Sequence, residues 1–332
     1  MREPAFWWRP AGIAASLLAP FGALYGAITA RRMAVKGVSA GVPVLCIGNF
    51  TLGGSGKTPT VMALARMLTE AGERPFCLSR GYGGDAREPK LVHAGTDVAA
   101  QVGDEPLMLT GIAPTVVARD RVAGAAFACA RGAGLIIMDD GLQNSSLRKN
   151  FTLAVVDARR GIGNGHIFPA GPLRAPLATQ LVQSDALLLV GDGTGAAEVI
   201  EQAQARALSV FHGYLVPDSA AIEAVRGRKV LAFAGIGDPE KFFTTAAEAG
   251  IAIAERRVFG DHHRYTAEEA AELIMQAEHN GLALLTTEKD HVRMAGERLL
   301  EALAARAHTL KVTMMVKEAD ELRSLLASKL GR

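Results

Sequence analysis

The sequence predicts an α/β protein, built from a parallel sheet flanked by helices and a second, smaller α/β lobe. Two observations indicate this fold class. Apolar runs of strand length alternate along the chain with segments of helical periodicity, a pattern that is typical of parallel sheets. The chain of 332 residues, 49% of them apolar, is also long enough to bury one large core or two modest ones. We expect a division into residues 1–32, 33–205 and 206–332.

The first segment, residues 1–32, is apolar enough to associate with a membrane. Residues 11–30 carry no charge, and aromatic and basic side chains flank them: Phe6, Trp7, Trp8, Arg9, Arg31 and Arg32. A helix of about 20 residues can span a bilayer, but Pro20 and scattered glycines weaken such a helix. We predict a segment that lies in the interface, with the tryptophans at headgroup level and the arginines on anionic lipid. A spanning helix, an ordinary core helix and a secretory signal are the alternatives.

A glycine-rich turn follows the first apolar strand run, residues 42–48, and precedes a periodic helical segment that begins near Val61. A strand, such a turn and a helix in this order form a phosphate cradle, because the N–H groups of the turn and the helix dipole point at one anion. Lys57 can reach the β- and γ-phosphates, and Thr58 can hold magnesium. The alternative is a glycine-rich turn with a solvated lysine.

We therefore predict a P-loop that binds a nucleoside triphosphate. Thr51 stands where the P-loop pattern has its first glycine, and Gly53 and Gly54 can supply the flexibility instead. Because this site needs cytosolic ATP, it argues against a secretory signal at the N-terminus. The residues expected to bind the nucleotide are Thr51, Leu52, Gly53, Gly54, Ser55, Gly56, Lys57 and Thr58.

Arginines follow the next two predicted strands, which cover residues 74–79 and 114–118. Arg80 opens a loop rich in glycine, and its planar guanidinium suits phosphate, although a solvated turn arginine is the alternative. Arg119 and Arg121 come after the later strand and can also reach phosphates.

Two acidic residues, Asp104 and Glu105, precede Pro106 and a helix that is expected from Leu107. An Asp at this position is typical of a helix N-cap. Transfer of a phosphoryl group to a hydroxyl, however, needs a carboxylate that accepts or orients the proton of the attacking group. No other loop up to this point of the chain offers one.

Residues 134–138 predict a further buried strand, and Asp139 and Asp140 stand at its end. Carboxylates at the end of a parallel strand are typical of a Walker B element, which holds the magnesium that bridges the phosphates. We favour Asp140 as the closer ligand. Strands expected over residues 153–156 and 186–190 continue the sheet.

The pattern restarts near residue 206, where we place the boundary of the second lobe. Its expected helices begin after Pro239, at a capping box of Thr266 with Glu269, and at Glu318. Its expected strands cover residues 210–216, 229–234, 252–258, 282–285 and 310–316.

Charge and cysteine content exclude other classes of protein. A net charge of +2 and the lack of a long lysine–arginine run make nucleic acid an unexpected partner. Cys46, Cys77 and Cys129 lack CxxC spacing, and we interpret them as small buried hydrophobes in a reducing compartment. The sequence indicates no protein partner.

Together these motifs resemble the tetraacyldisaccharide 4′-kinases, the P-loop lipid kinases of lipid A biosynthesis. The resemblance covers nearly the whole chain. It is carried by residues 49–59, 79–83, 102–106, 139–143, 169–174, 259–262 and 287–290.

The resemblance implies transfer of the γ-phosphoryl group of ATP to the 4′-hydroxyl of a tetraacylated, 1-phosphorylated glucosamine disaccharide, giving lipid IVA. It implies that the enzyme works at the cytoplasmic face of the bacterial inner membrane, attached peripherally or monotopically, and that its two lobes close on each other. In that family the residue matching Asp104 acts as the base, paired with the residue matching His262 from the other lobe.

The expected site then comprises three sets of residues. Lys57 joins Asp104 and His262 as a catalytic residue. Mg²⁺ is expected at Thr58, Glu105, Asp139 and Asp140. The residues expected to contact the acylated disaccharide are Asn49, Arg80, Tyr82, Arg121, Gln143 and Arg174.

One departure from the family pattern concerns Ala175, since the family usually carries Glu after the arginine that matches Arg174.

Two alternatives remain for the function. A P-loop GTPase or metallochaperone recognises guanine with Asn or Thr, then Lys, any residue and Asp, whereas here Glu288 separates Thr287 from Lys289. A membrane-associated ATP-binding module without chemistry would lack the base.

Overall fold

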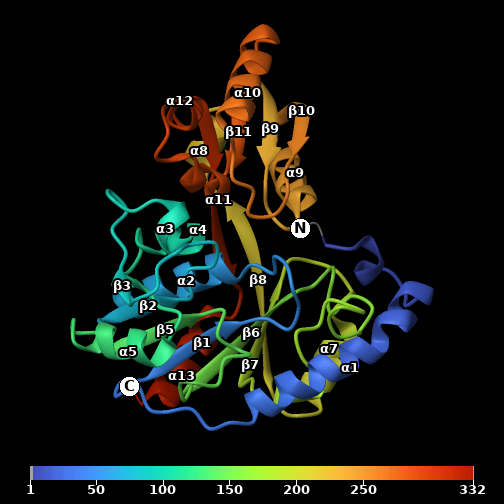
Figure 1. Cartoon of the computed structure of the whole chain (residues 1–332), viewed down its shortest axis with the longest axis vertical. Coiled ribbons are helices and arrows are strands. Elements are labelled where there is room, and N and C mark those ends of the chain that lie inside the picture. Colours follow the sequence, from blue (N-terminus) through green and yellow to red (C-terminus); the bar gives the residue numbers. More distant parts are fainter. Residues whose placement is uncertain (1–2, 332) are drawn as a thin grey trace.

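The computed structural model describes residues 3–331, which form two lobes, each built around its own sheet (Figure 1). The nine strands of the large lobe are β1 (Val44–Gly48), β2 (Pro75–Ser79), β3 (Lys90–Leu91), β4 (Thr115–Val117), β5 (Leu135–Asp139), β6 (Phe151–Asp157), β7 (Ala186–Val190), β8 (Ser209–Pro217) and β13 (Val312–Val316). Their order is β13-β8-β7-β6-β1-β5-β2-β4-β3. Pairing is parallel from β8 to β4, and only the two outermost strands are antiparallel to their neighbours.

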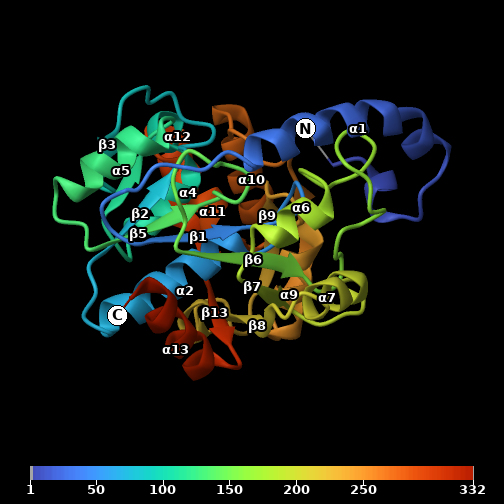
Figure 2. The ribbon, with the colours of Figure 1, turned by 90° about the horizontal axis from the view of Figure 1, so that it is seen from below.

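Helices cover both faces of this sheet (Figure 2), and for that reason the central strands read as continuous apolar runs in the sequence. Every residue of β1, at the centre, is buried. On one face pack α2 (Lys57–Glu70), α4 (Asp104–Leu109), which follows α3 (Ala99–Val102), and α13 (Ala319–Leu330). On the other face pack α5 (Arg121–Cys129), α6 (Leu177–Val182) and α7 (Ala197–Gln204).

The small lobe is a parallel sheet of four strands between two layers of helices. In the order β10-β9-β11-β12 its strands are β10 (Ala252–Val258), β9 (Lys229–Ala234), β11 (Ala283–Thr287) and β12 (Ala307–Leu310). One face is covered by α8 (Ser219–Glu223) and α9 (Pro239–Glu248), and the other by α10 (Ala267–His279) and α12 (Arg298–Arg306). The expected capping box of Thr266 and Glu269 begins α10. Two short helical turns, α11 (Glu288–His291) and η2 (Val292–Met294), follow β11.

The lobes separate at different residues from those expected. β8 pairs with β7, and β13 pairs with β8, so both strands and α13 belong to the large lobe. The small lobe is therefore an insertion between β8 and β13. The run expected as one strand over residues 310–316 is two strands of different sheets, β12 and β13. Sequence periodicity does not reveal this, because it cannot tell which strands pair with which across a long insertion.

The N-terminal segment forms a short turn, η1 (Ala5–Trp8), and the helix α1 (Ile13–Met33), which lies along the flank of the large lobe (Figure 1). Pro20 lies within this helix. Small residues face the protein: a Cβ on Gly22 would lie 2.7 Å from the carbonyl oxygen of Ile167. Large apolar residues face outward, namely Ile13, Leu17, Phe21, Leu24, Tyr25 and Ile28. Among residues 3–331, α1 alone is long and apolar enough to cross a membrane, by length and composition.

Candidate active site

The loop between β1 and α2 has the backbone geometry of an anion cradle. Gly56, the N-cap of α2, has φ of 93°, a left-handed conformation that favours glycine. Lys57 is the first residue of the helix and Thr58 the second, so both stand at the positive end of its dipole. Burial lowers the pKa of Lys57, and the carboxylate of Asp140 opposes this shift.

Residues 172–174 hold this loop through backbone and side-chain hydrogen bonds. The N–H of Leu52 donates to the carbonyl oxygen of Pro172 at 2.8 Å. Thr51 forms an antiparallel bridge with Leu173, and its carbonyl oxygen accepts a hydrogen bond from Nε of Arg174 at 2.9 Å. The bridge shows that Thr51 is extended, so the loop does not need a glycine at this position.

Asp139 ends β5 beside the loop, as the Walker B interpretation predicts for a strand-end carboxylate. Its side chain is only 1% exposed. The hydroxyl of Ser79 donates to one carboxylate oxygen at 3.4 Å, and the other oxygen has no partner. Burial, and then the charges of Glu105 and Asp140, raise the pKa of Asp139 above its usual range.

Asp140, the next residue, is held by two cations. It has a left-handed backbone conformation, with φ of 51°. Nη1 of Arg174 donates to both carboxylate oxygens, at 2.8 and 2.9 Å, and Nζ of Lys57 lies 3.6 Å from one of them. Burial alone would raise the pKa of Asp140, but Arg174 and Lys57 outweigh it and hold the pKa below its usual range.

Buried polar atoms without a partner gather around this loop. In the described part of the chain, three of the four such side-chain atoms belong to Asn49, Ser55 and Asp139. The fourth belongs to Glu3, whose carboxylate lies against Gly53. An unsatisfied buried polar atom costs about 1 to 3 kcal/mol, so this cluster indicates a place that a polar ligand completes.

The oxygen atoms present fit magnesium. Thr58, Asp139 and Asp140 offer hydroxyl and carboxylate oxygens, which are the ligands that Mg²⁺ prefers. No group of three or more His, Cys, Asp or Glu side chains in residues 3–331 forms a metal site by itself. Mg²⁺ commonly takes its remaining ligands from substrate phosphates and water.

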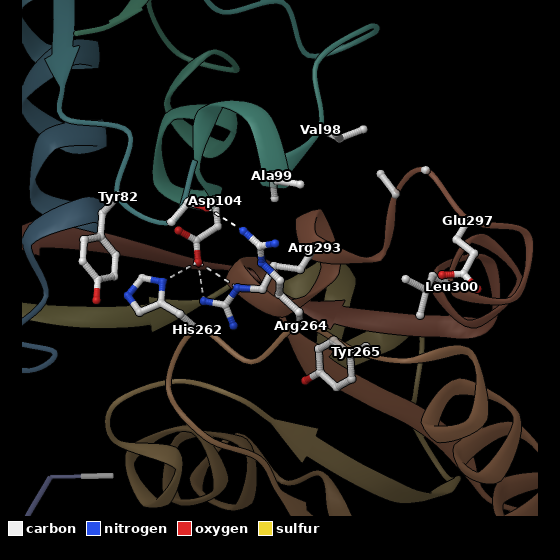
Figure 3. Close-up of a pocket in the computed structure, with 14 residues that line it drawn as sticks. Tyr82, Val98, Ala99, Asp104, His262, Arg264, Tyr265, Arg293, Glu297 and Leu300 are labelled. Atoms are coloured by element: carbon white, nitrogen blue, oxygen red, sulfur yellow. Dashed lines mark hydrogen bonds and ion pairs between the residues drawn. The ribbon is translucent and has the colours of Figure 1, made fainter. Parts of the chain in front are cut away.

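A second cluster joins the two lobes. Asp104, at the start of α4, is 4% exposed and faces His262 from the loop after β10. Nδ1 of His262 donates to Oδ2 of Asp104 at 3.1 Å (Figure 3). The backbone of His262 is left-handed, with φ of 55°, a conformation that is uncommon for residues other than glycine and often marks functional sites.

Two further cations of the small lobe bind the acidic pair of the large lobe. Arg293 donates to Oδ2 of Asp104 through Nε at 2.7 Å and also through Nη2, and its Nη1 donates to the carbonyl oxygen of Gly235 at 2.7 Å. Nζ of Lys289 lies 3.1 Å from Glu105 and 3.3 Å from Nε2 of His262. Burial alone would raise the pKa of Asp104, but His262, Lys289 and Arg293 hold it well below its usual range. Asp104 is therefore ionised.

A cavity of about 300 Å³ opens beside Asp104 and His262, between the lobes (Figure 3). Its polar wall includes Asp104, His262 and Arg293, and the ring of Tyr82 packs edge-on against that of His262 with 4.9 Å between centroids. Its apolar wall includes Val98, Ala99 and Leu300. The ionised carboxylate of Asp104 thus faces a cavity lined by both polar and apolar residues.

Two of the arginines expected to bind substrate differ in their surroundings. Arg80 is exposed at the end of β2. Arg121 is 3% exposed, and its guanidinium donates to the carbonyl oxygens of Ala118 and Asp139. In this structure Arg121 therefore supports the backbone at Asp139 rather than facing the cavity.

The two expected amides, Asn49 and Gln143, lie under the P-loop. Nδ2 of Asn49 donates to the carbonyl oxygen of Thr51 at 2.7 Å. Nε2 of Gln143 donates to the carbonyl oxygen of Asn49 and to Oε1 of Gln180. Gln143 therefore has no amide hydrogen left for a ligand. Ala175 is fully buried in the apolar core, and its carbonyl oxygen accepts a hydrogen bond from Gln180.

Sequence reasoning missed Arg293, Gln180 and Glu3. Arg293 stands three residues after Asp290, and this spacing was the only feature of the sequence that could have identified it as a site residue. Gln180 follows no motif at all. Glu3 accepts from Arg160 at 3.1 Å, and Arg160 also pairs with Asp238 of the small lobe at 3.0 Å. The N-terminal segment therefore contacts both the P-loop and the junction of the lobes.

We expect Arg293→Met to destabilise the protein by about 3 to 5 kcal/mol, because it removes a buried cation that binds the carboxylates of both Asp104 and Asp290. Urea unfolding measures this. The control is Arg298→Met, at an exposed position of α12, which should change the free energy of unfolding by less than about 0.5 kcal/mol. The double variant Asp104→Asn with Arg293→Met should recover part of the loss. No recovery would mean that the loss comes from Asp290, the other buried partner of Arg293, or from packing, and not from Asp104.

Known proteins resemble this chain over its full length. Residues 14–331 match the family model described as Tetraacyldisaccharide-1-P 4′-kinase (LpxK). The chain is 51% identical over 332 residues to the tetraacyldisaccharide 4′-kinase of Rhodopseudomonas palustris strain BisB5, covering 100% of this chain and 98% of that protein. It is 53% identical over 296 residues to the enzyme of that name from Bradyrhizobium diazoefficiens, covering 89% and 88%.

A solved structure agrees with these matches. LpxK from Aquifex aeolicus, in complex with ATP, superposes with a TM-score of 0.73 at 25% identity and covers 96% of this chain and 100% of that one. The fold class expected from the sequence is confirmed by this likeness. The chain belongs to the tetraacyldisaccharide-1-P 4′-kinase family.

Proposed function

We propose that this protein transfers the γ-phosphoryl group of ATP to the 4′-hydroxyl of a tetraacyldisaccharide 1-phosphate and so forms lipid IVA. The observation that carries the proposal is the Asp104–His262 hydrogen bond across the lobes, next to the phosphate cradle. The charge of the neighbouring Glu105 acts on both Lys57 and Asp139, so the two clusters belong to one site.

The large lobe has the groups that bind a nucleotide triphosphate. The N–H groups of residues 53–58 and the N-terminus of α2 favour the phosphates, and Lys57 is close enough to Asp140 to exchange that partner for the γ-phosphate. Thr58, Asp139 and Asp140 would hold Mg²⁺, which neutralises charge on the phosphates when bound. Asp139, rather than the Asp140 favoured from the sequence, is the better candidate for the closer ligand, because one oxygen of Asp139 has no partner and both oxygens of Asp140 already accept from Arg174.

The acceptor hydroxyl would approach from the cavity between the lobes. Asp104 is ionised and buried, and His262 and Arg293 fix its Oδ2. In a loose phosphoryl-transfer transition state the nucleophile needs orientation more than a strong base. A carboxylate of low pKa in a fixed position meets this need: Asp104 would take up the proton of the acceptor hydroxyl, while the N–H groups of His262 and Arg293 hold Asp104 in place.

The structure offers little to a guanine nucleotide. Asp290 is fully buried, where it accepts from Tyr265 and Arg293, and Lys289 binds Glu105. These residues are not free to recognise a base. The experiment is to measure nucleoside diphosphate release from ATP and from GTP, with and without the disaccharide lipid. We expect release from ATP that depends on the lipid. Release from GTP without the lipid would favour a GTPase.

We expect Asp139→Asn to raise the magnesium concentration for half-maximal activity by about tenfold or more, since it removes a charged ligand but keeps the shape of the strand end. Asp140→Asn should raise it less and should also weaken the contacts of Arg174. The measurement is a magnesium titration at saturating ATP, with thermal unfolding as the test of folding. Unchanged titrations in both variants would show that this strand does not carry the metal ligands.

We further propose that α1 holds the enzyme on the cytoplasmic face of the bacterial inner membrane without spanning it. The large apolar residues of α1 point away from the protein, and its glycines lie against Ile167, Ala170 and Pro176. Arg31 and Arg32 at its end suit anionic lipid. A substrate with four acyl chains stays in the bilayer, so the enzyme has to reach it there.

We expect the double variant Leu17→Glu with Leu24→Glu to weaken binding to phospholipid vesicles by about 100-fold or more, because each exposed leucine contributes about 1.5 to 3 kcal/mol when buried. The matched control is Met275→Glu with Leu299→Glu, which changes exposed apolar residues on helices of the small lobe. Vesicle sedimentation measures both. Equal loss in the two variants would show that α1 is not the membrane surface.

A further inference from the structure

Gln180, on α6, is a completely buried amide beneath the P-loop, with no exposed surface. Its Nε2 donates to two carbonyl oxygens, that of Phe50 at 3.2 Å and that of Ala175 at 2.9 Å. Its Oε1 accepts from Nε2 of Gln143 at 2.7 Å. Each of its polar atoms therefore has a partner inside the protein.

These partners fix which way the amide of Gln180 points. A carbonyl oxygen can only accept, so the two carbonyl groups require the nitrogen of Gln180 on their side. Its oxygen must then face Gln143. A flipped amide would set one oxygen against two others and leave buried groups unsatisfied, which is costly.

The orientation of the Gln180 amide also fixes that of the Gln143 amide. Its amide nitrogen has to face the oxygen of Gln180, and it also donates to the carbonyl oxygen of Asn49 at 2.8 Å. The carbonyl oxygen of Gln143 is thereby turned toward Arg174, with 3.5 Å between Oε1 and Nη1. If Gln143 were reversed, its NH₂ group would face the guanidinium, and two donors would oppose each other.

Arg174 in turn fixes Asp140. The same Nη1 donates to both oxygens of Asp140, and Nε is held by the carbonyl oxygen of Thr51. Asp140 has an uncommon left-handed backbone that its neighbours must support. A continuous series of contacts therefore connects α6 to the end of β5: Gln180, Gln143, Arg174 and Asp140.

We infer that Gln180 is a positioning residue of the nucleotide site, which acts through Gln143 and Arg174 to hold Asp140 in place. The inference rests on the proposed function of Asp140 at the magnesium–nucleotide site. Gln180 itself touches neither substrate nor metal, because its polar atoms are all used inside the protein.

The test compares Gln180→Met with Gln183→Met, three residues further along, at the end of the same helix. Methionine keeps the length of the side chain but removes its hydrogen bonds. The readouts are kcat for lipid phosphorylation and calorimetric binding of ADP with magnesium. We expect Gln180→Met to lower kcat on the order of tenfold, the effect of losing about one net hydrogen bond, and to weaken ADP binding in magnesium but not without it. Gln183→Met should match wild type in both.

A double-mutant cycle separates positioning from simple stabilisation. With Gln143→Ala already present, Gln180→Met should lower kcat by less than about twofold, because the connection is already broken. A full second loss would mean that Gln180 acts on stability alone and would overturn the inference. Equal kcat and ADP binding in Gln180→Met and Gln183→Met would also overturn it.

If Gln180→Met does not fold, Gln180→Glu provides the same test. The carboxylate still accepts from Gln143 but sets a second oxygen against the carbonyl groups of Phe50 and Ala175, so the same loss in kcat is expected at pH 8. Wild-type kcat in this variant would contradict the inference. Failure of wild type to bind ADP with magnesium would contradict the proposed function instead.

Discussion

Lys57→Ala should lower the turnover of lipid phosphorylation on the order of a thousandfold, because it removes the charge that follows the γ-phosphate into the transition state. The loss should lie in chemistry rather than in folding. Asp140 keeps both hydrogen bonds to Arg174 when Lys57 is absent, so the variant leaves no carboxylate unpaired. Single-turnover kinetics with saturating ATP and lipid measures the effect, and thermal unfolding tests the fold.

The matched control for this variant is Lys229→Ala, at an exposed position at the start of β9. It removes the same charge from the small lobe and should leave turnover unchanged within about twofold. Turnover of Lys57→Ala within tenfold of wild type would contradict the assignment of the phosphate cradle.

Alanine at Asp104 or at His262 should each slow catalysis by about a hundredfold to ten-thousandfold, since the two side chains orient one proton transfer. The double variant should slow catalysis little more than the slower single variant, because the effects of groups that act as a unit are not additive. Pre-steady-state rates for the four proteins of the cycle measure this coupling.

His263 offers a close control for His262. It is the next residue, but Nε2 of His263 pairs with Glu269 at 2.8 Å and its ring stacks on Phe259, so it belongs to the small lobe alone. His263→Ala should therefore leave the rate of phosphoryl transfer nearly unchanged. If the losses at Asp104 and His262 multiply in full, the two residues act separately, and the hydrogen bond between them has no catalytic role.

The parts of the site that could be predicted from the sequence are those whose geometry is local. A strand, a glycine turn and a helix fix Lys57 and Thr58 within a few residues, and Asp139 follows directly from the end of a buried run. The capping box at Thr266 is equally local. In each case the residues that make the contact are neighbours in the chain, so their spacing carries the information.

The parts that could not be predicted depend on contacts between distant segments. Arg293 meets Asp104 only because the small lobe folds back onto α4. Gln180 lies under the P-loop only because β6 and β7 pair beside β1. The predicted boundary between the lobes was wrong for the same reason, since β13 pairs with β8 although the whole small lobe separates them in the sequence. Residue type alone also gave a wrong expectation for Arg121. An arginine at this position suggests a phosphate contact, yet its guanidinium donates to the backbone carbonyl oxygen of Asp139.

The most direct test of the central claim is the position of the phosphate in the product. Wild-type protein is incubated with γ-labelled ATP, magnesium and the tetraacyldisaccharide 1-phosphate, and the lipid is isolated and fragmented in a mass spectrometer. We predict one added phosphate for each ADP formed, on the 4′-oxygen of the distal glucosamine, and formation of this product at least about a hundredfold more slowly with Asp104→Ala. ADP formation with an unchanged lipid, or a phosphate on another hydroxyl, would contradict it.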